Sequence, residues 1–267
     1  MWLQARCELF FEIENPTPFL FMLRPRSGDQ QWIAQERYDI SPSTNVREFA
    51  DKNGNLCQRL VALPGDFKIR TSSTVRTADA SDEDLTAAFI SIEDLPNNTL
   101  EYLLPSRYCE SDVMQGRVND IVRGKPLGYQ QVKAISEWIA SNIEYLPGSS
   151  NFPIGSVDIL QKQRGVCRDL AHVGISLCRS LSIPARFVVG YLNNLEPMDI
   201  HAWFEAYVGG RWFTFDATQD SLAGGRIAIA YGRDAADVAI ANQFGPAVFP
   251  YHMMVNIKQL VDFKPMF

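Results

Sequence analysis

The chain is short of basic residues and of long apolar runs, and both shortages exclude a class of partner. Of its 267 residues, 25 are Lys or Arg and 31 are Asp or Glu, which gives a formal net charge of −6. A surface that binds nucleic acid needs an excess of Lys and Arg against phosphates, so we expect no nucleic-acid partner. No uninterrupted apolar run approaches the roughly 18 residues that cross a bilayer, so we expect no membrane association.

Cysteine and histidine are both sparse. The cysteines are Cys7, Cys57, Cys109, Cys167 and Cys178. An odd, widely spaced set does not suit a disulfide framework and is typical of a reducing cytoplasm. Four charged residues interrupt the first 14 positions, so no secretory signal is expected, and we predict a cytoplasmic protein. Neither CxxC nor HExxH occurs, so we expect no metal and no cofactor.

The first hundred residues predict a β-rich domain. Short segments with β-branched and aromatic residues alternate with turn signals such as Asn15-Pro16 and Pro64-Gly65. Asn53-Gly54 lies between two such segments and predicts a two-residue hairpin turn. We therefore expect a β-sandwich-like domain over residues 1–105 that holds no catalytic residue. Its predicted strands are residues 7–14, 19–23, 45–51, 56–62 and 67–75.

From residue 106 onward the pattern changes to a mixture of helices and strands. Apolar residues recur at steps of three and four, which predicts amphipathic helices. Gly209-Gly210 predicts a tight hairpin. The fold class is therefore α+β, with a catalytic domain over residues 106–267 in which a helix packs on an antiparallel sheet. The predicted helices are residues 111–122, 126–143 and 166–181, and the predicted strands are residues 185–192, 200–208 and 211–217.

Cys167 lies at the start of a predicted helix, directly after Gly165-Val166. A thiol there faces free backbone N–H groups and the positive end of the helix dipole, and both favour the thiolate. The same amides can bind an oxyanion, and the Cys167 N–H is the donor we name. The alternative is an inert buried cysteine, which is the commoner fate of cysteines in cores and the one we predict for Cys178.

The hairpin supplies a base and a carboxylate for this thiol. With a two-residue turn, Val208 pairs with Arg211, which makes Asp216 a same-face diagonal neighbour of His201. Diagonal neighbours have Cβ atoms about 7–8 Å apart or less, within reach of a carboxylate that orients an imidazole. Cys167, His201 and Asp216 therefore form a candidate catalytic triad. The alternative is a half-buried polar pair with no cysteine nearby.

Four linked blocks carry a resemblance to a known family. They are GVCRD at 165–169, IPAR at 183–186, DIHAWFE at 199–205 and WFTFDAT at 212–218. Together they resemble the bacterial transglutaminase-like family, whose members are similar in fold to papain-like cysteine proteases. The family's cysteine, histidine and aspartate fall on the same three residues. Its second oxyanion donor has no clear match, since Trp138 is predicted to pack within a helix and Asn151 to lie in a loop.

Two functions follow from these observations. The first is a cysteine-dependent amide hydrolase or acyl transferase that acts on a peptide or protein through an acyl-enzyme. The family resemblance leaves open whether water or an amine resolves that intermediate. The second is a non-catalytic binding or scaffold module that keeps the fold, with the β-rich half as its partner surface.

Overall fold

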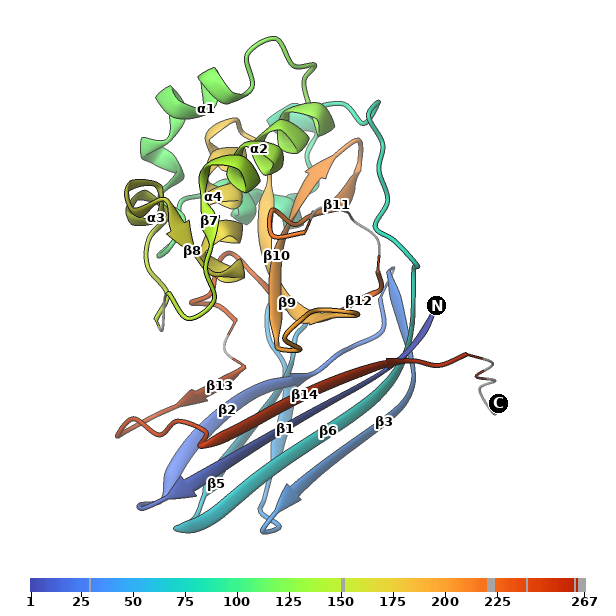
Figure 1. The fold of residues 1–267 in the computed structure, drawn as a ribbon, viewed down its shortest axis with the longest axis vertical. Coiled ribbons are helices and arrows are strands. Elements are labelled where there is room, and N and C mark those ends of the chain that lie inside the picture. The colour runs from blue at the N-terminus through green and yellow to red at the C-terminus, as the bar shows by residue number, and fades with distance from the viewer. Residues whose placement is uncertain (29, 150–151, 220–223, 239, 262, 264–267) are drawn as a thin grey trace.

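Two antiparallel sheets, packed face to face, form one half of the molecule (Figure 1). The computed structural model describes residues 1–267 except 29, 150–151, 220–223, 239, 262 and 264–267. Buried and exposed positions alternate along β1, so one face of the strand enters the core. Phe11, Phe19 and Phe67 fill the space between the sheets, with ring centroids 5.3–6.3 Å apart. One sheet has the order β14 (His252–Gln259), β1 (Trp2–Ile13), β6 (Gly65–Thr77), β3 (Gln31–Ser41); the other has β13 (Ala241–Gln243), β2 (Thr17–Arg24), β5 (Leu56–Ala62), β4 (Arg47–Ala50).

The β-sandwich-like N-terminal region is confirmed, with two differences in detail. The strand β3 was not predicted, because it lies at a sheet edge and most of its side chains are exposed or half-buried, which hides the alternation. The prediction of a two-residue turn at Asn53-Gly54 is wrong, because Ala50 pairs with Leu56 and the loop between them has five residues. The Asp51 carboxylate closes this longer loop by accepting the N–H groups of Asn53 and Asn55 at 2.9 and 2.8 Å.

The end of the chain returns to the N-terminal sheets. β14 pairs with β1 from Leu3↔Gln259 to Phe10↔His252, and β13 pairs with β2. Both strands lie within residues 106–267, which the sequence assigned to the catalytic domain, so the N-terminal sandwich takes strands from that range. The physical reason is that β1 and β2 would otherwise present unpaired edges. The division into two separately folding domains stays a prediction.

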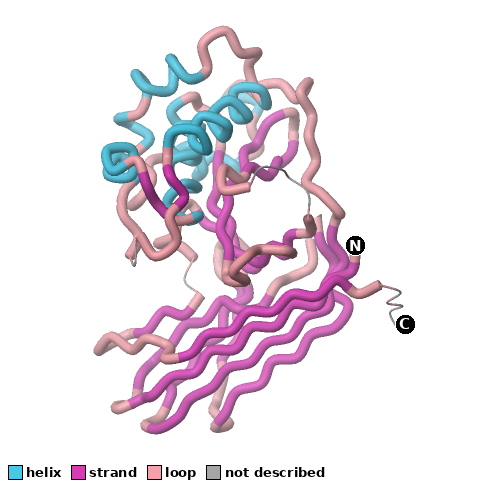
Figure 2. The backbone as a smooth tube through the Cα atoms, in the orientation of Figure 1, coloured by secondary structure: helices cyan, strands magenta, loops and turns pink. Residues whose placement is uncertain are grey.

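The other half of the molecule gathers its helices on one side of a third antiparallel sheet (Figure 2). Helix α4 packs on β10, and a Cβ at Gly174 would lie 2.5 Å from the Phe204 ring, so only glycine allows this approach. The predicted helix on an antiparallel sheet is confirmed. The helices are α1 (Gln115–Ile121), α2 (Tyr129–Asn142), α3 (Ser156–Lys162) and α4 (Cys167–Ser180), with short 3₁₀ turns η1 (Ile92–Asp94), η2 (Asn97–Leu103) and η3 (Ser111–Val113). The sheet order is β11 (Arg211–Phe215), β10 (His201–Val208), β9 (Ala185–Leu192), β12 (Arg226–Gly232), and β7 (Glu144–Tyr145) pairs with β8 (Arg164–Gly165).

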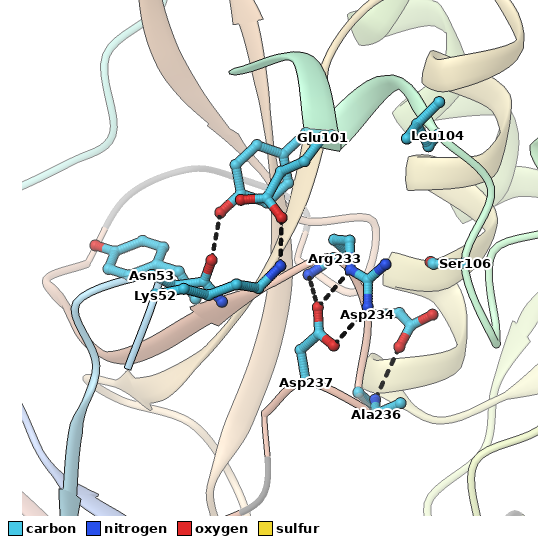
Figure 3. Close-up of polar contacts among 12 residues, drawn as sticks. Lys52, Asn53, Glu101, Leu104, Ser106, Arg233, Asp234, Ala236 and Asp237 are labelled. Atoms are coloured by element: carbon cyan, nitrogen blue, oxygen red, sulfur yellow. Dashed lines mark hydrogen bonds and ion pairs between the residues drawn. The ribbon is translucent and has the colours of Figure 1, made fainter. Parts of the chain in front are cut away.

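Polar contacts join the two halves at the loop between β4 and β5. Lys52 forms an ion pair with Glu101 of η2, and Asn53 accepts a hydrogen bond from Tyr102 at 3.2 Å (Figure 3). Nearby, Arg233 forms an ion pair with Asp237 at 2.8 Å. The N-terminal sheets are therefore tied to the segments that flank the third sheet.

No helix in the described part of the chain is long and apolar enough to cross a membrane. The cytoplasmic location stays a prediction from the cysteine pattern.

Candidate active site

The structure places Cys167 at the first position of α4. Val166 precedes it in an extended conformation, and β8 leads into the turn. The buried Asp169 carboxylate accepts the Val166 N–H at 3.2 Å and pairs with Arg168 at 3.2 Å. Asp169 thus caps the helix, because an acidic group stabilises a helix start. Cys167 is half-buried, whereas the four other cysteines are buried.

The hairpin has the predicted register. Val208 pairs with Arg211 and Phe204 with Phe215 across the Gly209-Gly210 turn. Just beyond the paired residues, His201 Nε2 lies 2.8 Å from Asp216 Oδ2, and each side chain is 1% exposed. The expected contact between these two side chains is therefore present. Since an ionised carboxylate only accepts hydrogen bonds, His201 Nε2 is the donor.

Two further residues hold the Asp216 carboxylate. Thr218 donates its hydroxyl to Asp216 Oδ1 at 2.7 Å and its backbone N–H to the same oxygen at 3.1 Å. Arg226 Nη2 lies 3.3 Å from Oδ2, the oxygen that also binds His201. The sequence signal for Thr218 was its position opposite His201 in the hairpin. Arg226 had no such signal, because it follows the hairpin in a segment without a clear pattern.

The pKa values of His201 and Asp216 are shifted in opposite directions by the groups around them. Burial is the largest influence on His201 and lowers its pKa, but Asp216 and Cys167 outweigh burial and raise the pKa to about 9. Burial would raise the pKa of Asp216, yet His201, Arg226 and Thr218 together hold it below its ordinary value. The site therefore favours an imidazolium beside a carboxylate at neutral pH.

Cys167 lies near His201, but the thiol and the imidazole do not form a hydrogen bond of ordinary geometry. Its side chain is one of the groups that raise the pKa of His201. The second ring nitrogen, Nδ1, is buried and has no geometrically regular hydrogen bond to any described residue. Catalytic hydrogen bonds are often loose before substrate binds, so this arrangement leaves Nδ1 for the thiol. For a thiol that acts with this histidine, we predict a distance of about 3–4.5 Å between the Cys167 sulfur and a His201 ring nitrogen.

The two other histidines lie elsewhere. His172 is buried on α4 and accepts the Ala235 N–H at its Nε2, at 3.1 Å. His252 is exposed on β14, against Phe10. His201 is thus the histidine that the fold brings to Cys167.

Trp138 and Asn151 lacked a clear match to the family's second oxyanion donor, and Tyr145 is a separate neighbour of the site. Trp138 packs against the core from α2, as predicted. Asn151 lies outside the described residues. Tyr145 lies on β7, directly beside Gly165, and Cys167 is among the charges that, after burial, raise its pKa. Tyr145 therefore borders the site, and the residue is 40% exposed.

A cavity of about 1190 Å³ opens between the two halves, and neither Cys167 nor His201 lines it. Its walls include Trp203 and Arg226, which lie against the His201–Asp216 pair. Among the described residues, no group of three or more His, Cys, Asp or Glu side chains is placed to hold a metal ion.

Comparison with known proteins identifies the class. Residues 115–217 match the model of the transglutaminase-like superfamily. The crystal structure titled "Putative Cysteine Protease from Cytophaga hutchinsonii" superposes with a TM-score of 0.90 at 37% identity and covers 100% of this chain and 93% of that chain. An uncharacterized protein of Mycobacterium leprae is 27% identical over 230 residues, which are 81% of this chain and 82% of the relative. The chain belongs to the transglutaminase-like superfamily and has its mixed α/β fold, which confirms the resemblance seen in the four sequence blocks.

Proposed function

We propose that the protein is a cysteine-dependent enzyme that cleaves or transfers amide bonds of a peptide or protein, with Cys167 as nucleophile. The observation that carries the proposal is the buried 2.8 Å contact between His201 and Asp216 beside a half-buried cysteine at a helix start. Membership of the superfamily supports it, as does the relative described as a putative cysteine protease. The role of each residue follows from the chemistry.

In the first half-reaction, the Cys167 thiolate attacks the amide carbonyl carbon and forms a C–S bond. The backbone N–H of Cys167 donates to the oxyanion. The C–N bond then breaks, and the His201 imidazolium gives its proton to the leaving nitrogen. The products are a thioester on Cys167, a free amine and a neutral His201.

In the second half-reaction, neutral His201 takes a proton from the incoming nucleophile, which attacks the thioester. Water yields a carboxylic acid and makes the protein a hydrolase; an amine yields a new amide and makes it an acyl transferase. The C–S bond breaks, which restores the thiolate and the imidazolium. Asp216 keeps the ring oriented and stabilises its positive charge throughout.

Alkylation by iodoacetamide tests the nucleophile directly. We expect the native protein to be modified at Cys167 alone and rapidly between pH 6 and 7, where an ordinary thiol with a pKa of about 8.5 is mostly protonated. The chain supplies its own controls: burial raises the pKa of Cys7 to about 11 and that of Cys109 to about 12. Peptide mapping by mass spectrometry identifies the modified residue, and Cys167→Ala should remove the label.

The same experiment separates the enzyme from the scaffold module. If Cys167 reacts no faster than a model thiol at pH 6–7, the enzyme proposal fails and the scaffold alternative gains. If Cys167 reacts fast, incubation with peptide libraries, with and without an added primary amine, identifies the acyl group held on Cys167. The released product, acid or amide, then decides between hydrolase and transferase.

A further inference from the structure

β12 is an edge strand of the third sheet, and the side of β12 that has no strand partner among the described residues faces the N-terminal sandwich (Figure 1). The Gln31 side chain donates to the Ala228 carbonyl and accepts the Ala228 N–H, each at 2.8 Å. Asn55 makes the same pair of contacts with the Tyr231 backbone, also at 2.8 Å. Both amide side chains are buried. They act as strand partners for β12, which fixes that strand to the N-terminal half.

The start of β12 is held by the segment that leaves β6. Thr77 donates its hydroxyl to the Arg226 carbonyl at 2.9 Å, and the Gly224 N–H reaches the Asp79 carbonyl at 3.0 Å. The guanidinium of Arg226 extends the connection, because its Nη1 lies 3.3 Å from Ser81 Oγ. The backbone and the side chain of Arg226 are therefore both fixed by residues 77–81.

The other end of the same guanidinium reaches the candidate triad. Arg226 Nη2 lies 3.3 Å from Asp216 Oδ2, with side chains 7% and 1% exposed. That oxygen also accepts the His201 Nε2–H, while Oδ1 is held by Thr218. A carboxylate held on both oxygens from two elements cannot rotate away from the imidazole. Removing one partner of a buried ion pair is costly, because it leaves the other charge uncompensated.

We propose that Arg226 is a positioning residue through which the N-terminal sandwich holds Asp216, and with it His201, in the orientation that the reaction needs. The proposal rests on the proposed function for its effect on rate, but its effect on the His201–Asp216 contact can be measured without any substrate. It assigns the sandwich a role: its contacts with β12 fix the strand from which Arg226 reaches Asp216.

A second arginine in the same sheet provides a matched control. Arg186 on β9 is paired with the buried Glu205 at 2.8 and 2.6 Å, and its guanidinium lies 4.2 Å from the ring centroids of Trp212 and Tyr231. It has the same chemistry and a partner buried to the same degree as Asp216, but it does not contact the candidate triad. Arg186→Gln therefore measures what the loss of a buried arginine–carboxylate pair does to stability alone.

The experiment compares Arg226→Gln, Arg226→Lys and Arg186→Gln in the full chain. The readout is the proton on His201 Nε2, followed by NMR with labelled histidine, of which the chain has three. A proton donated to a buried, fixed carboxylate exchanges slowly with water. We expect exchange about tenfold faster in Arg226→Gln, an intermediate rate in Arg226→Lys because the charge is kept, and no change in Arg186→Gln, whose melting temperature falls.

Cys167 alkylation at pH 6–7 is the second readout, and it should fall in the same order as the exchange rate rises. Ser81→Ala removes one contact of the guanidinium and should give a smaller change in the same direction. The proposal is overturned if Arg226→Gln, in a folded protein, exchanges like wild type or if Arg186→Gln has the same effect. If the exchange pattern is as expected but wild-type Cys167 is unreactive, the positioning role stands and the proposed function fails.

Discussion

His172 and His201 are both buried in the helical half of the molecule, and their pKa values move in opposite directions. Burial is the main cause that lowers the pKa of His172 to about 3. The nearby Asp234 offsets only part of this decrease, and Arg168 and Arg179 lower the pKa further. The pKa of His201 is raised to about 9, since Asp216 and Cys167 outweigh the same effect of burial. The two sites lie in one fold and differ mainly in what touches the ring.

The contacts explain the difference. A backbone N–H donates to His172 Nε2, which requires that nitrogen to be unprotonated, and the ring stacks on Tyr108 at 5.4 Å. His201 instead donates to a carboxylate at 2.8 Å. Burial penalises the cation at both positions, and at His201 the direct hydrogen bond to the Asp216 carboxylate, together with Cys167, compensates for it. His172 is therefore a neutral packing residue at neutral pH, whereas His201 is a cation. Of the two, only His201 has a charge state that suits proton transfer to a leaving group.

Replacing each histidine by alanine should give the largest contrast. His201→Ala is expected to lower Cys167-dependent turnover by roughly 10²–10⁴-fold, because it removes both the proton donor and the charge that pairs with the thiolate. His172→Ala should leave turnover per folded molecule unchanged and cost about 1–3 kcal/mol of stability, since it leaves the buried Ala235 N–H without an acceptor. Initial rates and urea unfolding measure the two effects. Equal losses of turnover in both variants would contradict the division of roles.

The pH dependence of stability should have opposite signs at the two sites. An unfolded histidine has a pKa of about 6.5. Because the pKa of folded His201 is raised to about 9, its contribution is fully present below pH 6.5 and is lost as the pH rises toward 9. Because the pKa of folded His172 is lowered to about 3, its contribution is present above pH 6.5 and is lost as the pH falls toward 3.

Free energies of unfolding at pH 5, 6.5 and 9 test this prediction in wild type, His201→Gln and His172→Gln. The His201 contribution is on the order of 3 kcal/mol, because each tenfold gain in proton affinity on folding corresponds to about 1.4 kcal/mol. We expect His201→Gln to flatten the curve above pH 6.5 and His172→Gln to flatten it below. If both variants flatten the same limb, the two rings do not have opposite charge states.

Replacing the neighbouring carboxylates should give the smallest effect. Asp216→Asn keeps a group that can orient the ring but removes the charge, so we expect the pKa of His201 to fall below 9 and turnover to drop roughly tenfold. Asp234→Asn is the control, because Asp234 is also buried but binds the backbone N–H groups of Tyr108 and Ala236. It should leave turnover and the His201 titration unchanged. A folded Asp216→Asn protein as inactive as Cys167→Ala would show that charge matters more than orientation.

Local sequence determined the parts of the site that lie close together in the chain. Gly209-Gly210 fixed the turn, the turn fixed the register, and the alternation of side chains put His201 and Asp216 on one face. Gly165 and the apolar period of the next helix fixed its start at Cys167. These features follow from sequence because each rests on neighbours within one helix or one hairpin, where spacing translates directly into direction.

Only the tertiary structure decided what surrounds these residues. The pairing of β14 with β1, and of Gln31 with Ala228 across 197 positions of sequence, leaves no periodic signal in either segment. Arg226 follows Asp216 by ten residues, but this spacing alone does not predict their contact. The contact depends on where β12 lies in the sheet, and the N-terminal sandwich holds that strand at the sheet edge. The opposite pKa shifts of His172 and His201 have the same origin, since charge state depends on which groups the folded chain brings to each ring.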